Sequence, residues 1–124
     1  MLKQEALTHA IVGAAIDVHR TLGPGLLEGV YEECLAFELR DRDLDVKRQV
    51  TVPLVYKGNA LNSNLRIDLL VNNAVVVELK AIESLMPIHE AQLMTYLRLM
   101  GKEVGLLINF NVPVLKQGIV RRVL

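Results

Sequence analysis

Apolar residues recur at helical spacing near the start of the chain. They form one stripe over residues 5–20 and just beyond, made by Leu7, Ala10, Ile11, Ala14, Ala15, Val18 and Leu22. The segment LGPG (22–25) should end this helix, because Gly and Pro interrupt helices. A second helix is predicted from about Leu26 to Arg42, and a third from about Ile88 to Met100, ending at Gly101.

Between the second and third helices the pattern changes to that of strands. Residues 46–56 are rich in β-branched residues, and Pro53 within them predicts an edge position or a bulge, since proline has no N–H to donate. Residues 56–64 resemble a turn with a loose entry into the next strand. Residues 65–71 and 74–80 are predicted as two strands of a hairpin.

The last third of the chain predicts two more strands. Residues 104–110 are a continuous apolar run, as expected for a buried strand, and residues 114–124 form the final one. The connection from residue 80 to residue 104 contains a helix, which would allow the strands that it joins to run parallel. The order of helix, helix, three-stranded meander, helix, strand and strand predicts an α/β fold with a mixed sheet.

Composition limits the class of protein. A length of 124 residues predicts a single domain over 1–124, and an apolar fraction of 52% is ample for a compact core. No apolar run approaches the roughly 20 residues that span a bilayer, and the first residues lack a secretory signal. With its one cysteine, Cys34, the chain is expected to be cytoplasmic and not membrane-bound.

The net charge gives little information about binding partners. Lys plus Arg and Asp plus Glu both number 14, so the net charge of zero argues against strong nonspecific binding to nucleic acid, although a local basic patch remains compatible with it. The apolar composition is also compatible with a homodimer or another protein partner. The sequence locates no such interface.

Candidate chemistry lies in the predicted hairpin. Asp68 in RIDLLV, and Glu78 and Lys80 in VVVELK, are charged residues among apolar neighbours, where charge is costly unless it is paired or bound to metal. Glu78 and Lys80 are two residues apart and therefore share one face of the sheet, while Val75, Val77 and Leu79 take the other. Whether Asp68 joins Glu78 depends on the turn.

The length of the turn decides the register. A two-residue loop at Asn72 and Asn73 would place Asp68 opposite Val77, on the wrong face. A three-residue loop through Ala74 would place Asp68 directly opposite Glu78, with Cβ atoms roughly 5 Å apart. Asn tolerates the left-handed backbone that either loop needs, so turn chemistry leaves the choice open. Because two opposed carboxylates repel unless a cation lies between them, we expect the three-residue loop or an equivalent bulge.

Two carboxylates with a nearby lysine suit phosphodiester hydrolysis. The carboxylates can hold Mg²⁺, or Mn²⁺ in its place, with water completing the coordination. The metal activates water and neutralises phosphoryl charge, and a lysine stabilises developing negative charge. On its own, however, the pattern is equally compatible with a structural Glu–Lys or Asp–Lys pair.

Two helical features favour the metal site. Glu28 lies within the same helical arc as Tyr31, Leu35 and Leu39, so it is expected on the inward face near its helix N-terminus. A partner for the helix dipole is the alternative reading of Glu28. In the third helix Gln92 and Tyr96 form an i, i+4 pair beside an apolar stripe, where they are either an active-site wall or an ordinary polar rim. The candidate catalytic residues are therefore Lys80, Glu28, Gln92 and Tyr96.

The string GLLEGVYEE (25–33), with RIDLLV, VVVELKAIE, PIHEAQLMTYL and GLLINF, resembles the GxxExxY family over nearly the whole chain. That family is similar to the PD-(D/E)XK nuclease superfamily, whose restriction-endonuclease-like core is helix, three strands, helix and strand. The resemblance implies this core with a mixed central sheet and an extra N-terminal helix.

The resemblance also implies roles for individual residues. Asp68 and Glu78 would be the metal ligands, Lys80 the catalytic lysine and Glu28 an accessory acid. Gln92 and Tyr96 match the Q-x-x-x-Y element of the helicase-associated exonuclease branch. Ile67 departs from the pattern, replacing the proline before the first acid, and removes no ligand.

The expected function is therefore metal-dependent hydrolysis of DNA or RNA phosphodiester bonds, with nucleic acid as the partner. The alternative is a catalytically silent nuclease fold that binds nucleic acid or protein. Hydrolysis of a small phosphoester by the same site is a third reading.

Overall fold

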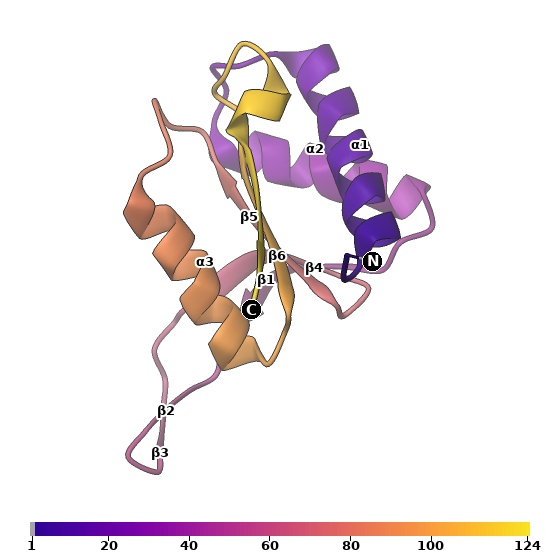
Figure 1. Ribbon diagram of the computed structural model, residues 1–124. Coiled ribbons are helices and arrows are strands. Elements are labelled where there is room, and N and C mark those ends of the chain that lie inside the picture. Colours follow the sequence, from indigo (N-terminus) through magenta and orange to yellow (C-terminus); the bar gives the residue numbers. More distant parts are fainter. Residues whose placement is uncertain (1) are drawn as a thin grey trace.

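The computed structural model describes residues 2–124 and consists of three helices packed around a sheet (Figure 1). The helices are α1 (Glu5–Leu22), α2 (Glu28–Asp41) and α3 (Pro87–Met100), with a short 3₁₀ helix, η1 (Leu115–Gly118). The strands are β1 (Val46–Thr51), β2 (Leu54–Tyr56), β3 (Asn59–Leu61), β4 (Arg66–Val71), β5 (Val75–Lys80), β6 (Val104–Asn109) and β7 (Ile119–Val123).

Five strands form a mixed sheet in the order β1-β4-β5-β6-β7. The meander β1, β4 and β5 is antiparallel, β5 and β6 run parallel, and β7 is antiparallel to β6. The parallel pair is connected through α3, as the length of that connection predicts. The predicted α/β class and mixed sheet are both confirmed.

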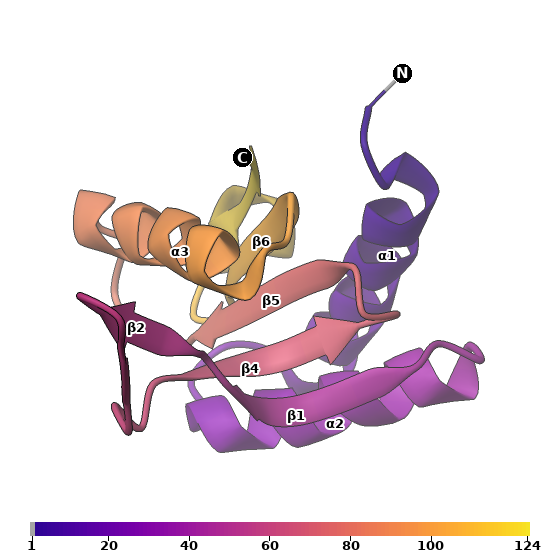
Figure 2. The same ribbon diagram turned by 90° about the horizontal axis from the view of Figure 1, so that it is seen from below.

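The sheet is covered on both faces, which gives three layers (Figures 1 and 2). Helices α1 and α2 pack on one face, and α3 packs on the other. Val75, Val77 and Leu79 of β5 join the core beneath α1 and α2, whereas Val76 joins the core beneath α3. This alternation confirms the predicted facing of β5 and places the side of Glu78 and Lys80 toward α3.

The region around Pro53 differs from the prediction. The strand expected over 46–56 is divided, because Val52 and Pro53 separate β1 from β2. The segment expected as a turn contains β3, which pairs with β2 in a separate two-stranded sheet. This hairpin projects from the body at the bottom of Figure 1. The final predicted strand likewise begins late, since η1 occupies its first part.

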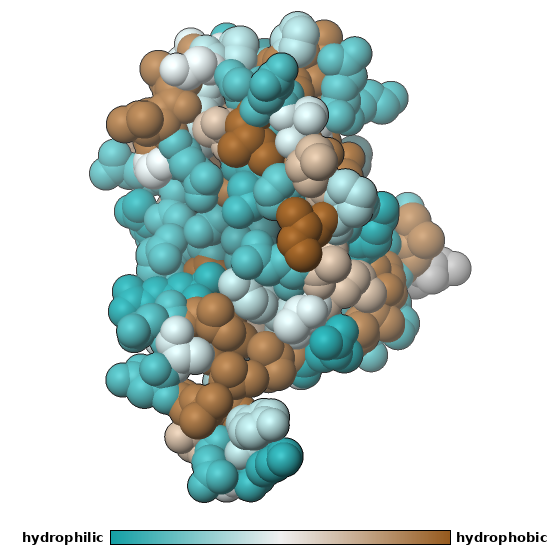
Figure 3. Space-filling view, turned by 90° about the vertical axis from the view of Figure 1, so that its left-hand side faces the viewer, coloured by the Kyte–Doolittle hydropathy of each residue, from teal (hydrophilic) through white to brown (hydrophobic). Residues whose placement is uncertain are grey.

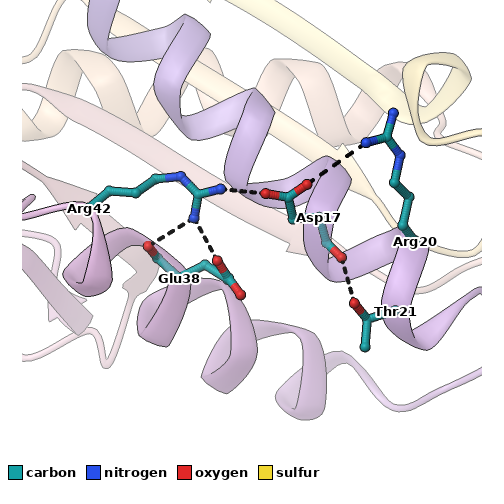
Figure 4. Close-up of polar contacts among 5 residues, drawn as sticks. All are labelled: Asp17, Arg20, Thr21, Glu38 and Arg42. Atoms are coloured by element: carbon teal, nitrogen blue, oxygen red, sulfur yellow. Dashed lines mark hydrogen bonds and ion pairs between the residues drawn. The ribbon is translucent and has the colours of Figure 1, made fainter.

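Helices α1 and α2 are joined by a polar cluster at their solvent-facing side (Figure 4). Arg42, just after α2, donates to Glu38 at 2.6 Å and to Asp17 of α1. Arg20 lies 3.9 Å from the other oxygen of Asp17. The cluster links the two helices above the apolar contacts that they share. None of the helices over residues 2–124 is long and apolar enough to cross a membrane.

Candidate functional site

The β4–β5 turn takes the longer of the two predicted forms. Val71 pairs with Val75, Leu70 with Val76 and Leu69 with Val77. Asn72 and Asn73 both have φ near 51°, which is the left-handed conformation that asparagine tolerates. The register therefore brings Asp68 opposite Glu78, and the predicted three-residue loop is confirmed.

Beyond that point the two strands separate. The backbone pairing between β4 and β5 ends at Leu69 and Val77. Beyond this pair, a side chain of β4 accepts the hydrogen bond that a backbone carbonyl would otherwise accept from β5. The Leu79 N–H donates to Asp68 Oδ2 at 2.7 Å, so the carboxylate occupies the gap between the strands. The backbones of β4 and β5 therefore diverge at Asp68, and this divergence positions the site.

Glu78 is buried where the two strands diverge, with 6% of its surface exposed. Among residues 2–124, its Oε1 is a buried side-chain atom without any hydrogen-bond partner. Burial and, to a lesser extent, the negative charge of Asp68 together raise the pKa of Glu78 to about 9, although Lys80 partly offsets both. A buried, unpartnered oxygen beside a second carboxylate is costly in isolation, and a cation between the two acids would satisfy both.

Lys80 is half-buried at the end of β5, level with Asn109 of the parallel neighbour β6. Asn109 itself is 1% exposed and fixes the connection that follows Lys80. Its Oδ1 accepts from the Ile82 N–H at 3.1 Å, and its Nδ2 donates to the Ile82 carbonyl at 3.0 Å. The sequence prediction missed this pair of hydrogen bonds, although a buried Asn at the end of an apolar strand needs such partners.

Glu28 reaches the same site from α2. Partial loss of hydration raises its pKa, Asp68 raises it further, Lys80 lowers it and Glu32 raises it. The side chain is directed toward these charges, as the inward-facing position predicts, but it remains solvent-exposed. The reason is its place as the first residue of α2, where the preceding Leu27 is itself 79% exposed and no element covers the helix end.

Tyr31 explains why the helix starts at Glu28. Its hydroxyl donates to the Gly23 carbonyl at 2.6 Å and accepts from the Leu26 N–H at 3.1 Å. Its ring stacks on Phe110 with centroids 4.5 Å apart. Tyr31 thus ties the Gly-Pro-Gly loop to the core and sets the position from which Glu28 projects.

Gln92 and Tyr96 line the site from α3. Tyr96 is buried, and its pKa is raised by desolvation and by the charge of Glu78. Gln92 is exposed, and its Nε2 donates to the Tyr96 hydroxyl at 3.1 Å. This hydrogen bond satisfies part of the donor and acceptor capacity of both side chains, and Tyr96 is the one whose pKa responds to the charges of Glu78 and Asp68.

Two polar residues near the acids were missed by the sequence prediction. Glu32 on α2 is 7% exposed, and Gln49 on β1 donates hydrogen bonds to both Glu32 and Asp68. Glu32 lies one helical turn after Glu28, so the spacing of the two acids could have indicated a shared direction. The contact of Gln49 depends on strand pairing between β1 and β4, which no local pattern contains.

The protein supplies two acidic ligands at most to a cation here. Within residues 2–124, no group of three or more His, Cys, Asp or Glu side chains is arranged to hold a metal ion. Two carboxylates are enough for a magnesium-type site, because that ion usually retains several waters and completes its coordination with substrate phosphate. The donor set therefore fits a hard divalent cation.

The surface around the site is mixed. Seen from the side of α3, the middle of the molecule is largely hydrophilic, with apolar groups near the top and just above the projecting β2–β3 hairpin (Figure 3). Val55 and Leu61 are the exposed aliphatic residues of that hairpin. A hollow of about 870 Å³ lies elsewhere, between the beginning of α1 and the β4–β5 turn, and none of the candidate site residues lines it.

An α/β/α sandwich with two acids and a lysine on adjacent central strands defines a nuclease-like class of fold. The family model of the PD-(D/E)XK nuclease superfamily matches residues 5–123. The chain belongs to this superfamily, and its fold is the restriction-endonuclease-like one. No curated protein and no solved structure matches the chain.

Proposed function

We propose that this protein is a metal-dependent nuclease that hydrolyses phosphodiester bonds of DNA or RNA, with Mg²⁺ or Mn²⁺ held between Asp68 and Glu78. The observation that carries the proposal is the unpartnered, buried Glu78 Oε1 beside the Asp68 carboxylate. Membership of the nuclease superfamily supports the same reading. The resemblance to the GxxExxY family belongs to this proposal too, through Gly25, Glu28 and Tyr31.

Each residue has a distinct task in this proposal. Asp68 and Glu78 bind and orient the cation, which when bound supplies positive charge to the phosphoryl group and activates water. Lys80, on the same face as Glu78, stabilises negative charge as it develops on the phosphate. Glu28 interacts electrostatically with Asp68 and Lys80, its pKa is raised by burial, and in this proposal it accepts the proton of the attacking water.

The α3 pair would act on the substrate side. Tyr96 packs near Glu78 and restricts water around it, and its hydroxyl accepts the Gln92 amide hydrogen. Gln92 is exposed and therefore free to contact a substrate phosphate or base through its remaining amide groups.

Cleavage assays test the proposal. Wild-type protein with Mg²⁺ or Mn²⁺ should cleave at least one of single- or double-stranded DNA and RNA, and chelation with EDTA should abolish cleavage. Asp68→Asn should remove activity, and Lys80→Ala should lower kcat by about 10²–10³-fold, the usual loss of one transition-state charge contact. Lys116→Ala, at an exposed lysine of η1, is the matched control and should retain full activity.

Cleavage that persists in Asp68→Asn would contradict the proposal, because the activity would then arise from another site or a contaminant. Metal binding by the wild type without cleavage of any substrate would favour the alternative function. In that case the fold would serve as a catalytically silent module that binds nucleic acid or protein.

A further inference from the structure

Gln49 has an unusual backbone for its place in the fold. It lies inside β1 with φ of 53°, and among residues 2–124 it is the one residue within a strand's bounds that is not glycine and has positive φ. Arg48 and Val50 on either side pair regularly with Leu69 and Ile67 of β4. The left-handed conformation thus interrupts the ladder at one point, where Gln49 faces Asp68. Strained backbone of this kind persists where the surroundings hold it and is common at functional sites.

The side chain of Gln49 joins two carboxylates. Its Nε2 donates to Glu32 Oε1 at 2.6 Å and to Asp68 Oδ1 at 3.2 Å. An amide NH₂ group has two hydrogens to donate, and a carboxylate only accepts. The chemistry of the two partners therefore requires that the nitrogen, and not the oxygen, of the amide lies between them.

Glu32 is the fixed end of this chain of contacts. It is buried, and its second oxygen, Oε2, accepts from Arg48 Nε at 3.0 Å and forms an ion pair with Arg48 Nη2 at the same distance. The guanidinium of Arg48 fixes the orientation of the buried Glu32 carboxylate. In this orientation the other carboxylate oxygen points toward Gln49. Helix α2 and strand β1 thereby hold the amide at a set place beside Asp68.

Asp68 is consequently held by two donors. The Leu79 N–H binds its Oδ2 at 2.7 Å, and Gln49 binds its Oδ1. We propose that Gln49, anchored by Glu32 and Arg48, is a positioning residue that fixes the orientation in which the Asp68 carboxylate binds the divalent cation. This inference rests on the metal site of the proposed function. Hydrogen-bond partners behind metal ligands typically change metal affinity 10–100-fold when they are removed.

Gln49→Asn is the sharpest variant. Asparagine keeps the amide and adopts the left-handed backbone more readily than glutamine, so the backbone is not strained further. Its side chain is one methylene shorter and cannot span from β1 to both carboxylates. Titration calorimetry with Mn²⁺ on the full chain should show a Kd raised about 10-fold or more, with a Tm within a few degrees of the wild type.

Gln4→Asn is the matched control. Gln4 also has a left-handed backbone, with φ of 52°, but lies before α1 and makes no side-chain capping bond. Its replacement should leave the Mn²⁺ affinity unchanged. Equal Mn²⁺ affinity of Gln49→Asn and wild type would overturn the inference, as would an equal loss in Gln4→Asn.

A metal-free readout separates this inference from the nuclease activity. In the NMR spectrum of the protein without metal, the side-chain amide signals of Gln49 should shift when Asp68 is replaced by Asn and should stay in place in Asp41→Asn, at the exposed end of α2. Unmoved signals in Asp68→Asn would overturn the contact. Wild-type protein that binds Mn²⁺ but cleaves nothing contradicts the proposed nuclease alone, and wild-type protein that binds no Mn²⁺ contradicts both.

Discussion

At the scale of single residues, the site combines groups that destabilise one another. Glu78 and Asp68 are adjacent acids, and Glu78 is buried with an unpartnered oxygen. Such groups persist in a folded protein when the rest of the structure compensates for them. The candidate site should therefore lower the stability of the metal-free protein.

The pH dependence of stability follows from Glu78. Its pKa rises from an ordinary 4.5 to about 9 on folding, so between these values the folded protein holds a proton that the unfolded chain has lost. The free energy of unfolding should thus fall as pH rises through this window, by up to about 1.4 kcal/mol per pH unit for one proton. Urea denaturation of metal-free wild type and Glu78→Gln at pH 5 to 9 measures the difference.

Glu78→Gln has no proton to lose and should remove this contribution, so it should be the more stable protein at pH 8 while losing metal binding. The exposed Glu83→Gln serves as the control and should follow the wild-type curve. Parallel curves for wild type and Glu78→Gln would show that Glu78 titrates normally, contrary to the account.

Residue identity was the part of the site best predicted from sequence. Charged residues in apolar strands are conspicuous, which is why Asp68, Glu78 and Lys80 were found from their neighbours alone. Glu28 was expected on the inward face of its helix. Its exposure could not be predicted, because helical spacing gives a direction but not the place where the covering layer ends. Gln49 was missed because its importance comes from a strand pairing distant in sequence.

At the scale of elements, the loop before α2 depends on one side chain. Tyr31 makes two hydrogen bonds to the backbone of Gly23 and Leu26 and stacks on Phe110. Tyr31→Phe keeps the stacking and loses both part-buried hydrogen bonds, so the Gly23 carbonyl and the Leu26 N–H each lose a partner. We expect a loss of about 1–3 kcal/mol in the free energy of unfolding, measured by chemical denaturation.

Tyr56→Phe is the control for this loss. Tyr56 is 60% exposed on the β2–β3 hairpin, and removal of its hydroxyl should leave stability unchanged. An unchanged denaturation midpoint for Tyr31→Phe would mean that the Gly-Pro-Gly loop is held by other contacts.

The β2–β3 hairpin is the element least integrated with the rest of the fold. Its strands pair only with each other among the described residues, and Val55 and Leu61 are exposed. A single two-stranded hairpin is marginally stable on its own. Its backbone amides should therefore exchange hydrogen orders of magnitude faster than those of β5 and β6, as measured by native-state hydrogen exchange.

Slow exchange in the hairpin, matching that of the central strands, would contradict this view and would indicate that another surface covers it in solution. The comparison is internal, since the central strands of the same protein serve as the reference. The sequence predicted a strand through this region because Val and Tyr favour extended backbone. It could not show that Pro53 directs β2 out of the main sheet.

At the scale of the whole molecule, the three-layer fold determines where chemistry can occur. The central strands β5 and β6 are buried on both faces, and their buried polar side chains, Glu78 and Asn109, lie in the C-terminal half of each strand. Elements from both helical layers meet at that end, with Glu28 from α2 and Tyr96 from α3. The overall order was predictable, because apolar periodicity and the length of the β5–β6 crossover determine layers and strand direction.

The central claim is that Asp68 and Glu78 together bind one divalent cation. Crystals of the wild type grown with Mn²⁺ test it most directly by anomalous scattering. We expect one anomalous peak within about 2–2.5 Å of an oxygen of each carboxylate, and its loss in Asp68→Asn. A fully ordered site with no peak at saturating Mn²⁺, or a peak bound only by other residues, would contradict it.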